Sequence, residues 1–172
     1  MRVESGDHAL FNGDYDLARA EYQQALNQSG EPALRVEALW GLGRTEYEAG
    51  NYDGAISYFN QITNEYPGTV RGAQAHFLLG EAYYALDRYA DAAAQYGAYL
   101  SLRAGLIDAY ALEVQGDAYF DAQNYIEALG VYNSANLAPR LDNGIDLQIK
   151  VAQTRTAIGD YATALALYDA IA

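Results

Sequence analysis

The chain has 172 residues, 51% of them apolar, which is enough for a domain with a substantial core and excludes an intrinsically disordered chain. Twenty-three acidic residues against ten basic ones give a net charge of −13, which disfavours nucleic acid and anionic lipid as partners because their phosphates are repelled. Cysteine is absent, which excludes disulfides and zinc–cysteine sites, and no apolar run reaches the roughly 18–20 residues of a membrane-spanning helix.

Apolar residues recur at three- and four-residue spacings along the whole chain, which predicts a series of amphipathic helices. In chain order the predicted helices are 2–12, 15–28, 33–49, 52–65, 70–86, 89–102, 106–122, 125–137, 144–157 and 161–171. The connection at 138–144 is longer and richer in turn residues than the others. The sequence therefore predicts an all-α chain without an internal domain boundary.

One pattern occurs five times, in the second helix of each predicted pair. A tyrosine opens these helices at Tyr15, Tyr52, Tyr89, Tyr125 and Tyr161, so successive units are 37, 37, 36 and 36 residues apart. An alanine follows three residues after each tyrosine, at Ala18, Ala55, Ala92, Ala128 and Ala164. In the first helix of each pair the same register carries Gly6, Gly43, Gly80 and Gly116, and then Ala152 in the fifth unit. A fixed period of this length predicts a solenoid, in which the small residues let the two helices approach closely.

The residue types of the second unit and their spacing also carry a family resemblance. Leu42, Gly43, Tyr47, Gly50, Tyr52, Ala55, Phe59 and Pro67 resemble the signature of the tetratricopeptide repeat, a helix-turn-helix unit of about 34 residues. The resemblance covers essentially the whole chain and implies one solenoid, a right-handed superhelix of about five repeats. The implied repeats are approximately 1–30, 31–68, 69–104, 105–141 and 142–172.

The joint after the second repeat contains residues that end one helix and start the next. Pro67 cannot continue the preceding helix, Gly68 is expected to relieve the turn, and Thr69 is expected to cap the following helix.

Side chains with catalytic or metal-binding chemistry are sparse. His8 and His76 do not occupy equivalent positions in the repeats. Glu113, Asp117 and Asp121 share one helix face, where a solvated acidic surface is favoured over a cation site or an acid–base pair. The phosphate-loop, H-E-x-x-H and G-x-S-x-G motifs are absent from the sequence. We therefore expect no catalytic residue, no metal site and no cofactor.

The resemblance implies a ligand groove lined by the first helix of each repeat. The implied groove residues are Trp40, Arg44, Tyr47, Phe77, Glu81, Tyr84, Glu113, Asp117 and Phe120, with Glu48, Asp121, Ile149 and Gln153 in the same register. Family members that grip an acidic C-terminal peptide use lysine, asparagine and arginine at these positions. This chain has acidic and aromatic residues there, so a basic or apolar peptide is expected. Packing between repeats is the alternative role for the aromatic rings.

The implied function is a non-catalytic scaffold that holds a peptide or a neighbouring protein domain. The sequence N-E-Y-P-G-T followed by A-H-F-L-L-G-E-A-Y-Y, within 64–84, is similar to repeats of bacterial envelope proteins of the Tol-Pal and outer-membrane-assembly type. This likeness implies the cell envelope or periplasm, although the residues themselves leave the cytoplasm open. The alternatives are the helical arm of a lytic murein transglycosylase and a groove for a small ligand or glycan.

The last predicted helix is followed by no polar capping helix. Tyr161, Leu165, Tyr168 and Ile171 are therefore expected to face water. We expect the chain to be part of a longer repeat protein and to self-associate through this apolar face.

Overall fold

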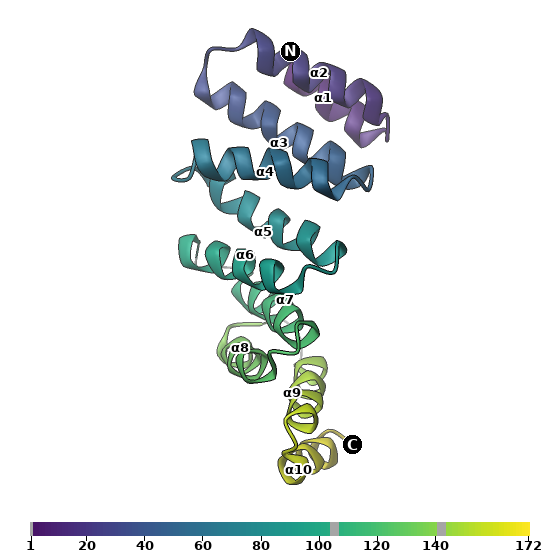
Figure 1. Cartoon of the computed structure of the whole chain (residues 1–172), viewed down its shortest axis with the longest axis vertical. Coiled ribbons are helices and arrows are strands. Elements are labelled where there is room, and N and C mark those ends of the chain that lie inside the picture. The colour runs from purple at the N-terminus through teal and green to yellow at the C-terminus, as the bar shows by residue number, and fades with distance from the viewer. Residues whose placement is uncertain (1, 104–106, 141–143) are drawn as a thin grey trace. The chain divides into compact units, whose positions relative to one another are not determined.

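The computed structural model describes residues 2–103, 107–140 and 144–172, and these residues form ten α-helices and no strand (Figure 1). The helices are α1 (Arg2–Phe11), α2 (Tyr15–Gln28), α3 (Pro32–Glu48), α4 (Tyr52–Glu65), α5 (Val70–Ala85), α6 (Tyr89–Leu102), α7 (Asp108–Asp121), α8 (Tyr125–Leu137), α9 (Ile145–Ala157) and α10 (Tyr161–Ile171). The predicted all-α fold is confirmed, and the observed helix ends lie within two residues of the predicted ones. The predicted start at 106 and part of the 138–144 connection lie outside the described residues. Within the described ranges, no helix is long and apolar enough to cross a membrane.

The chain divides into two compact units, Met1–Asp87 with α1–α5 and Arg88–Ala172 with α6–α10. Within each unit, every helix packs against the helix that follows it in the chain (Figure 1). In the first unit α3 also contacts α1 and α5, so the first helices of neighbouring repeats lie side by side. The single solenoid expected from the sequence remains a prediction.

In three repeats the glycine of the first helix faces an aromatic ring of the second helix. A Cβ atom added at Gly6 would lie 2.7 Å from the Tyr22 ring, and the same arrangement recurs in the pairs Gly43–Phe59 and Gly116–Tyr132. The three rings are at most 2% exposed. Glycine therefore leaves the space that the ring fills. The five second-helix alanines are also buried, as predicted, with at most 3% exposure.

The turn inside each helix pair contains one residue with a left-handed backbone, two positions before the opening tyrosine. These residues are Gly13, Gly50, Asp87, Gln123 and Gly159, with φ between 56° and 85°. A residue with a Cβ atom is disfavoured there by about 1–2 kcal/mol, so the third and fourth repeats hold a strained residue at this position.

The joint between α4 and α5 follows the prediction in two of three respects. Helix α4 ends at Glu65, before Pro67, and the Thr69 hydroxyl accepts a 2.9 Å hydrogen bond from the backbone N–H of Gly72. Gly68 has no positive φ, so the expectation that it relieves the turn through glycine's special backbone freedom is wrong.

The last helix leaves apolar side chains uncovered. Tyr161, Leu165 and Tyr168 are 69%, 61% and 39% exposed, and Ile171 is half-buried. Ala164 is the buried residue of α10. The predicted exposure of this face is therefore observed, and self-association through it stays a prediction.

Candidate functional site

Helices α1 and α3 and the first residue of α2 form a pocket of about 550 Å³, which we call the Phe11 pocket. It is lined by Asp7, Leu10, Phe11, Tyr15, Arg44 and Glu48. It therefore contains Arg44 of the predicted groove set and Glu48 of the same register. Asp7 and Phe11 stand one repeat earlier than Arg44 and Glu48, at the equivalent positions of α1. The sequence prediction named groove positions only from the second repeat onwards and therefore missed Asp7 and Phe11. The same positions in the first predicted helix, 2–12, identify both residues.

The Phe11 pocket combines an exposed aromatic ring with one unengaged cation. The side chain of Phe11 is 90% exposed. Arg44 makes no hydrogen bond or ion pair within the described residues, in contrast to Asp7, which accepts a 2.6 Å hydrogen bond from the Tyr22 hydroxyl. Burial and this bond to Asp7 raise the pKa of Tyr22, so the phenol stays protonated and keeps Asp7 in place. Apolar and charged contacts are thus both available to a partner.

A buried carboxylate fixes the helix that carries Arg44 and Glu48. Glu46 of α3 is 6% exposed and accepts a 2.6 Å hydrogen bond from Nε of Arg19 in α2. Its other oxygen accepts a 2.6 Å bond from Asn51, whose side chain caps α4 by accepting from the N–H of Gly54. The hydrogen bond to Glu46 raises the pKa of Arg19. Helices α2, α3 and α4 are thereby joined through Glu46, two residues from both Arg44 and Glu48.

Trp40, another predicted groove residue, is engaged in packing between repeats. Its ring lies 5.6 Å from that of Phe59, centroid to centroid, and the Arg71 guanidinium of α5 lies 4.6 Å from the ring centroid. Arg71 is held in turn by hydrogen bonds of 2.7–3.1 Å to Glu37 and by one of 3.0 Å to Gln74. Trp40 and Arg71 therefore connect α3 to α5, and only part of the indole remains accessible.

Two predicted aromatic residues pack at the turn inside their own repeat. Tyr47 meets Tyr52 edge to face with ring centroids 5.4 Å apart, and Phe120 meets Tyr125 in the same way at 5.2 Å. The two pairs occupy equivalent positions of the second and fourth repeats. Both contacts lie inside one repeat, whereas the alternative role considered for Phe120 was packing between repeats, so that alternative stays a prediction for Phe120.

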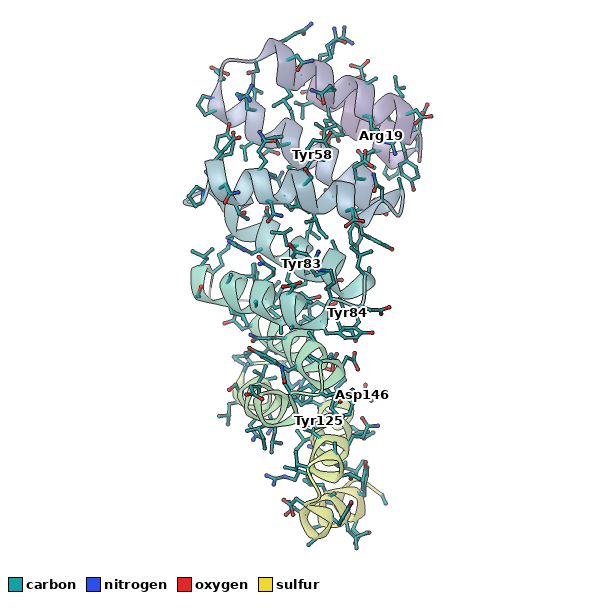
Figure 2. All side chains as sticks on the ribbon, in the orientation of Figure 1. Arg19, Tyr58, Tyr83, Tyr84, Tyr125 and Asp146 are labelled. Atoms are coloured by element: carbon teal, nitrogen blue, oxygen red, sulfur yellow. The ribbon has the colours of Figure 1, made fainter. Side chains whose placement is uncertain are left out.

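The predicted residues of the third repeat lie along α5. Phe77, Glu81 and Tyr84 are all half-buried, and Figure 2 shows Tyr84 near the C-terminal end of this helix. In the last repeat, Ile149 is half-buried and Gln153 is exposed. Among the described residues, no group of three or more His, Cys, Asp or Glu side chains is placed to hold a metal ion.

In the second unit, Glu113 and Asp117 of α7 are neutralised by neighbouring side chains. Lys150 of α9 donates to both carboxylates, at 2.9 Å and 2.8 Å. Arg140 donates to Glu113 at 3.0 Å, and the Tyr132 hydroxyl donates to Asp117 at 2.7 Å. The solvated acidic face expected from the sequence is therefore wrong for these two residues, although Asp121 is exposed.

The Lys150 cluster, meaning Lys150 with Glu113, Asp117, Arg140 and Tyr132, carries no net charge. Burial alone would lower the pKa of Lys150, but the hydrogen bonds to Asp117 and Glu113 outweigh it and raise the pKa. Two carboxylates face two cations, so the cluster offers no excess negative charge to a basic peptide. The hydrogen bond between Tyr132 and Asp117 could have been predicted from the sequence, because these residues occupy the positions equivalent to Tyr22 and Asp7.

The family model of the tetratricopeptide repeat matches residues 3–69 and 77–141. The outer membrane protein assembly factor BamD of Caulobacter vibrioides is 28% identical over 87 residues, a match that spans 50% of this chain and 28% of that protein. This agrees with the resemblance to outer-membrane-assembly repeats noted from the sequence.

Solved structures share the fold at low sequence identity. A crystal structure of MamA superposes with a TM-score of 0.82 at 20% identity and covers 99% of this chain and 87% of its own. BtubC from P. vanneervenii gives a TM-score of 0.72 at 19% identity and covers 96% and 75%, respectively. These likenesses confirm the repeat architecture.

Proposed function

We propose that this chain, which belongs to the tetratricopeptide repeat family, is a non-catalytic scaffold that binds a protein partner through the Phe11 pocket. Tetratricopeptide repeat proteins in general serve as scaffolds for protein–protein interaction, and the matched regions cover most of the chain.

The observation that carries the proposal is the nearly complete exposure of Phe11 beside Arg44. Burying an exposed phenylalanine in a partner is worth about 1.5–3 kcal/mol, whereas leaving it in water brings no stability to the fold. Among the described residues nothing accepts a hydrogen bond from Arg44, and aromatic and arginine side chains are the residue types that dominate binding energy at interfaces. The anchoring of α3 through Glu46 means that little ordering is needed when a partner binds.

The expected partner segment is apolar or aromatic and carries a basic residue. Leu10, Phe11 and Tyr15 supply the apolar contact, and Glu48 is exposed at the edge of the pocket. The unit Met1–Asp87 contains 13 acidic and five basic residues, so its net charge of −8 attracts basic segments over a longer range. The second unit has ten acidic and five basic residues, a net charge of −5, and its Lys150 cluster is neutral, so the support for a basic partner is stronger in the first unit.

The test selects peptides from a random displayed library on the intact chain. We expect enrichment of sequences that combine an aromatic or large aliphatic residue with lysine or arginine, and we expect them to lose at least about tenfold in affinity for Phe11→Asp, since about 1.4 kcal/mol corresponds to tenfold. Leu137→Asp is the matched control, because Leu137 is 86% exposed and lies on α8.

Enriched peptides that bind Phe11→Asp as tightly as the unchanged chain would show that the Phe11 pocket is not the site. Selection of predominantly acidic peptides would contradict the expected partner chemistry.

A further inference from the structure

A pocket of the second unit lies between α8, α9 and α10, and we call it the Asn136 pocket. Its volume is about 190 Å³. It is lined by Asn133 and Asn136 of α8, by Gln148, Val151 and Arg155 of α9, and by Thr163 and Leu167 of α10. Three of these side chains are carboxamides and two are aliphatic. The pocket therefore combines uncharged hydrogen-bonding groups with a small apolar surface.

The same space in the first unit is filled by apolar side chains. Helices α2, α3 and α4 are the counterparts of α8, α9 and α10, so the two spaces are formed by equivalent helices of two successive repeats. The equivalent residues are Leu26 for Asn136, Leu39 for Gln148 and Tyr58 for Leu167. Leu39 is fully buried, and Leu26 and Tyr58 pack against the same cluster. The Asn136 pocket therefore exists because polar or smaller side chains stand at these positions.

The polar side chains of the Asn136 pocket have hydrogen-bonding groups to spare. Asn133, Asn136 and Gln148 form no hydrogen bond within the described residues, and the two asparagines are exposed. Arg155 donates through Nη1 to Asp160 at 2.6 Å, whereas its buried Nε has no acceptor in the described part of the chain. A folded protein normally satisfies such a donor. The ion pair with Asp160 also neutralises the charge of the guanidinium.

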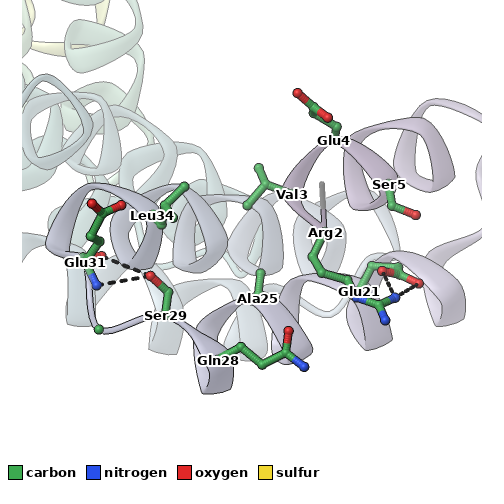
Figure 3. A pocket seen from close by; sticks show the side chains of 11 residues that line it. Arg2, Val3, Glu4, Ser5, Glu21, Ala25, Gln28, Ser29, Glu31 and Leu34 are labelled. Atoms are coloured by element: carbon green, nitrogen blue, oxygen red, sulfur yellow. Dashed lines mark hydrogen bonds and ion pairs between the residues drawn. The ribbon is translucent and has the colours of Figure 1, made fainter.

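A larger pocket of the first unit shows the opposite chemistry (Figure 3). It has a volume of about 830 Å³, and charged side chains line it, including Arg2, Glu4, Glu21 and Glu31. Arg2 donates to Glu21 at 2.8 and 3.0 Å, along the dashed lines of Figure 3. Ions suit a lining of this kind, whereas the carboxamides of the Asn136 pocket suit a neutral group that both donates and accepts hydrogen bonds.

The peptide group of a polypeptide main chain has this chemistry. Its N–H donates and its C=O accepts, so it can pair with a carboxamide through two hydrogen bonds. The volume of about 190 Å³ lies below the roughly 300–1,000 Å³ of pockets for small-molecule ligands and cofactors, and it leaves room for a short piece of main chain. A sugar is less suited, because none of the lining residues has an aromatic ring on which it could stack.

We infer that the Asn136 pocket binds the main chain of an extended, uncharged segment of a protein partner. The carboxamides of Asn136 and Gln148 pair with peptide groups of the segment, and the guanidinium of Arg155 donates to a carbonyl oxygen. A small aliphatic side chain of the segment contacts Val151 and Leu167. The inference rests on the proposed scaffold function and adds to it a second site, in the second unit, that recognises the main chain and not a charge.

The experiment follows the side-chain N–H resonances of the intact, isotope-labelled chain by NMR. The probe is N-acetyl-trialanine methylamide, which is neutral and presents mainly its main chain. We expect saturable shifts for the carboxamides of Asn133, Asn136 and Gln148 and for the Nε–H of Arg155, with a Kd in the millimolar range because the contact is small. The carboxamide of Gln28 is the internal control, because it is exposed in the charged pocket of Figure 3 and should not shift.

Two changes test recognition of the main chain. Replacing the central amide of the probe by an ester removes one N–H donor and should weaken binding at least about threefold. Asn136→Leu combined with Gln148→Leu gives both positions the leucines of the first unit, so the chain should fold, and the main-chain amide spectrum checks this. Binding should weaken at least about tenfold. Ser134→Leu is the matched control, because Ser134 is exposed on α8 and does not line the pocket.

The absence of saturable shifts with the probe would overturn the inference. Equal binding of the amide and ester probes, or equal binding to the doubly substituted chain and to Ser134→Leu, would do the same. Stronger shifts of these resonances with methyl β-glucoside than with the probe would assign the pocket to a sugar. The scaffold proposal is tested separately, with library peptides and Phe11→Asp, and that substitution should leave the NMR titration unchanged.

Discussion

Replacing Lys150 by methionine should destabilise the second unit by about 2 kcal/mol. The substitution keeps the length of the side chain but removes two charged hydrogen bonds, to Glu113 and Asp117. Bonds to charged groups contribute about 1.5–3 kcal/mol each when buried. The three side chains are 18–29% exposed, and each carboxylate keeps a second donor, from Arg140 or Tyr132, so the estimate lies well below the sum.

The assay is urea unfolding followed by circular dichroism. With a slope of about 2 kcal/mol per molar urea, the transition of the second unit should move by about 1 M. Arg103→Met is the matched control, because Arg103 is exposed in the same unit and forms no ion pair within the described residues. It removes the same charge and should shift the midpoint little.

The effect of Lys150 should also depend on pH in one direction. Its folded pKa is raised, so its contribution is fully present below the unfolded value of about 10.4 and is lost as the pH rises through the folded value. The difference between the unchanged chain and Lys150→Met should therefore shrink only in strong alkali. Equal midpoints for Lys150→Met and the unchanged chain at pH 7 would refute the assigned role of this cluster.

Four further results are expected. Ala128→Leu should overpack a fully buried position and lower stability by about 1–3 kcal/mol, whereas an unchanged thermal midpoint would show that the position is not a helix crossing. Gln123→Gly should raise stability by up to about 1 kcal/mol in urea unfolding, because it relieves a φ of 63°; a loss would contradict the strain. Hydrogen bonds from Thr163 and Arg155 lower the pKa of Asp160, so its cap contribution should persist above its unfolded pKa and fade as the pH falls through the folded value. Amide exchange of α10 should show this, and Asp160→Asn should remove the pH dependence. Leu165→Lys combined with Ile171→Lys should abolish weak self-association in sedimentation equilibrium, and a strictly monomeric unchanged chain would contradict the predicted contact.

The fold was predictable because the same physical requirement recurs in every repeat. Small residues at the crossings and a tyrosine at the start of each second helix fix both the period and the helix ends, since each repeat must bury its apolar face against a neighbour. Because the pattern occurs five times, a helix position that is ambiguous in one repeat is fixed by the equivalent positions of the others. The left-handed residue before each second helix follows the same period. It could not be recognised from the sequence in the third and fourth repeats, because Asp87 and Gln123 replace the glycine there.

The candidate sites were less predictable because they depend on positions where one repeat differs from the others. Lys150 stands where the four earlier repeats have Glu4, Gly41, Leu78 and Val114, so the register gave no reason to expect a cation facing Glu113. A periodic pattern predicts what repeats share, whereas a binding site is made by what they do not share.

The contact between glycine and aromatic ring has a consequence for how such a chain tolerates change. Alanine at Gly116 collides with the Tyr132 ring, yet it becomes acceptable once that ring has been replaced by a smaller side chain. The order of two substitutions then decides whether the intermediate folds. The fifth repeat already has Ala152 in the glycine position, and its aromatic partner position holds Tyr168, which is 39% exposed, whereas the rings at this position in the other four repeats are at most 2% exposed. A mutational scan should therefore find strong epistasis within these pairs and little between them. The sequences of the repeats would then diverge through paired substitutions at the glycine and ring positions.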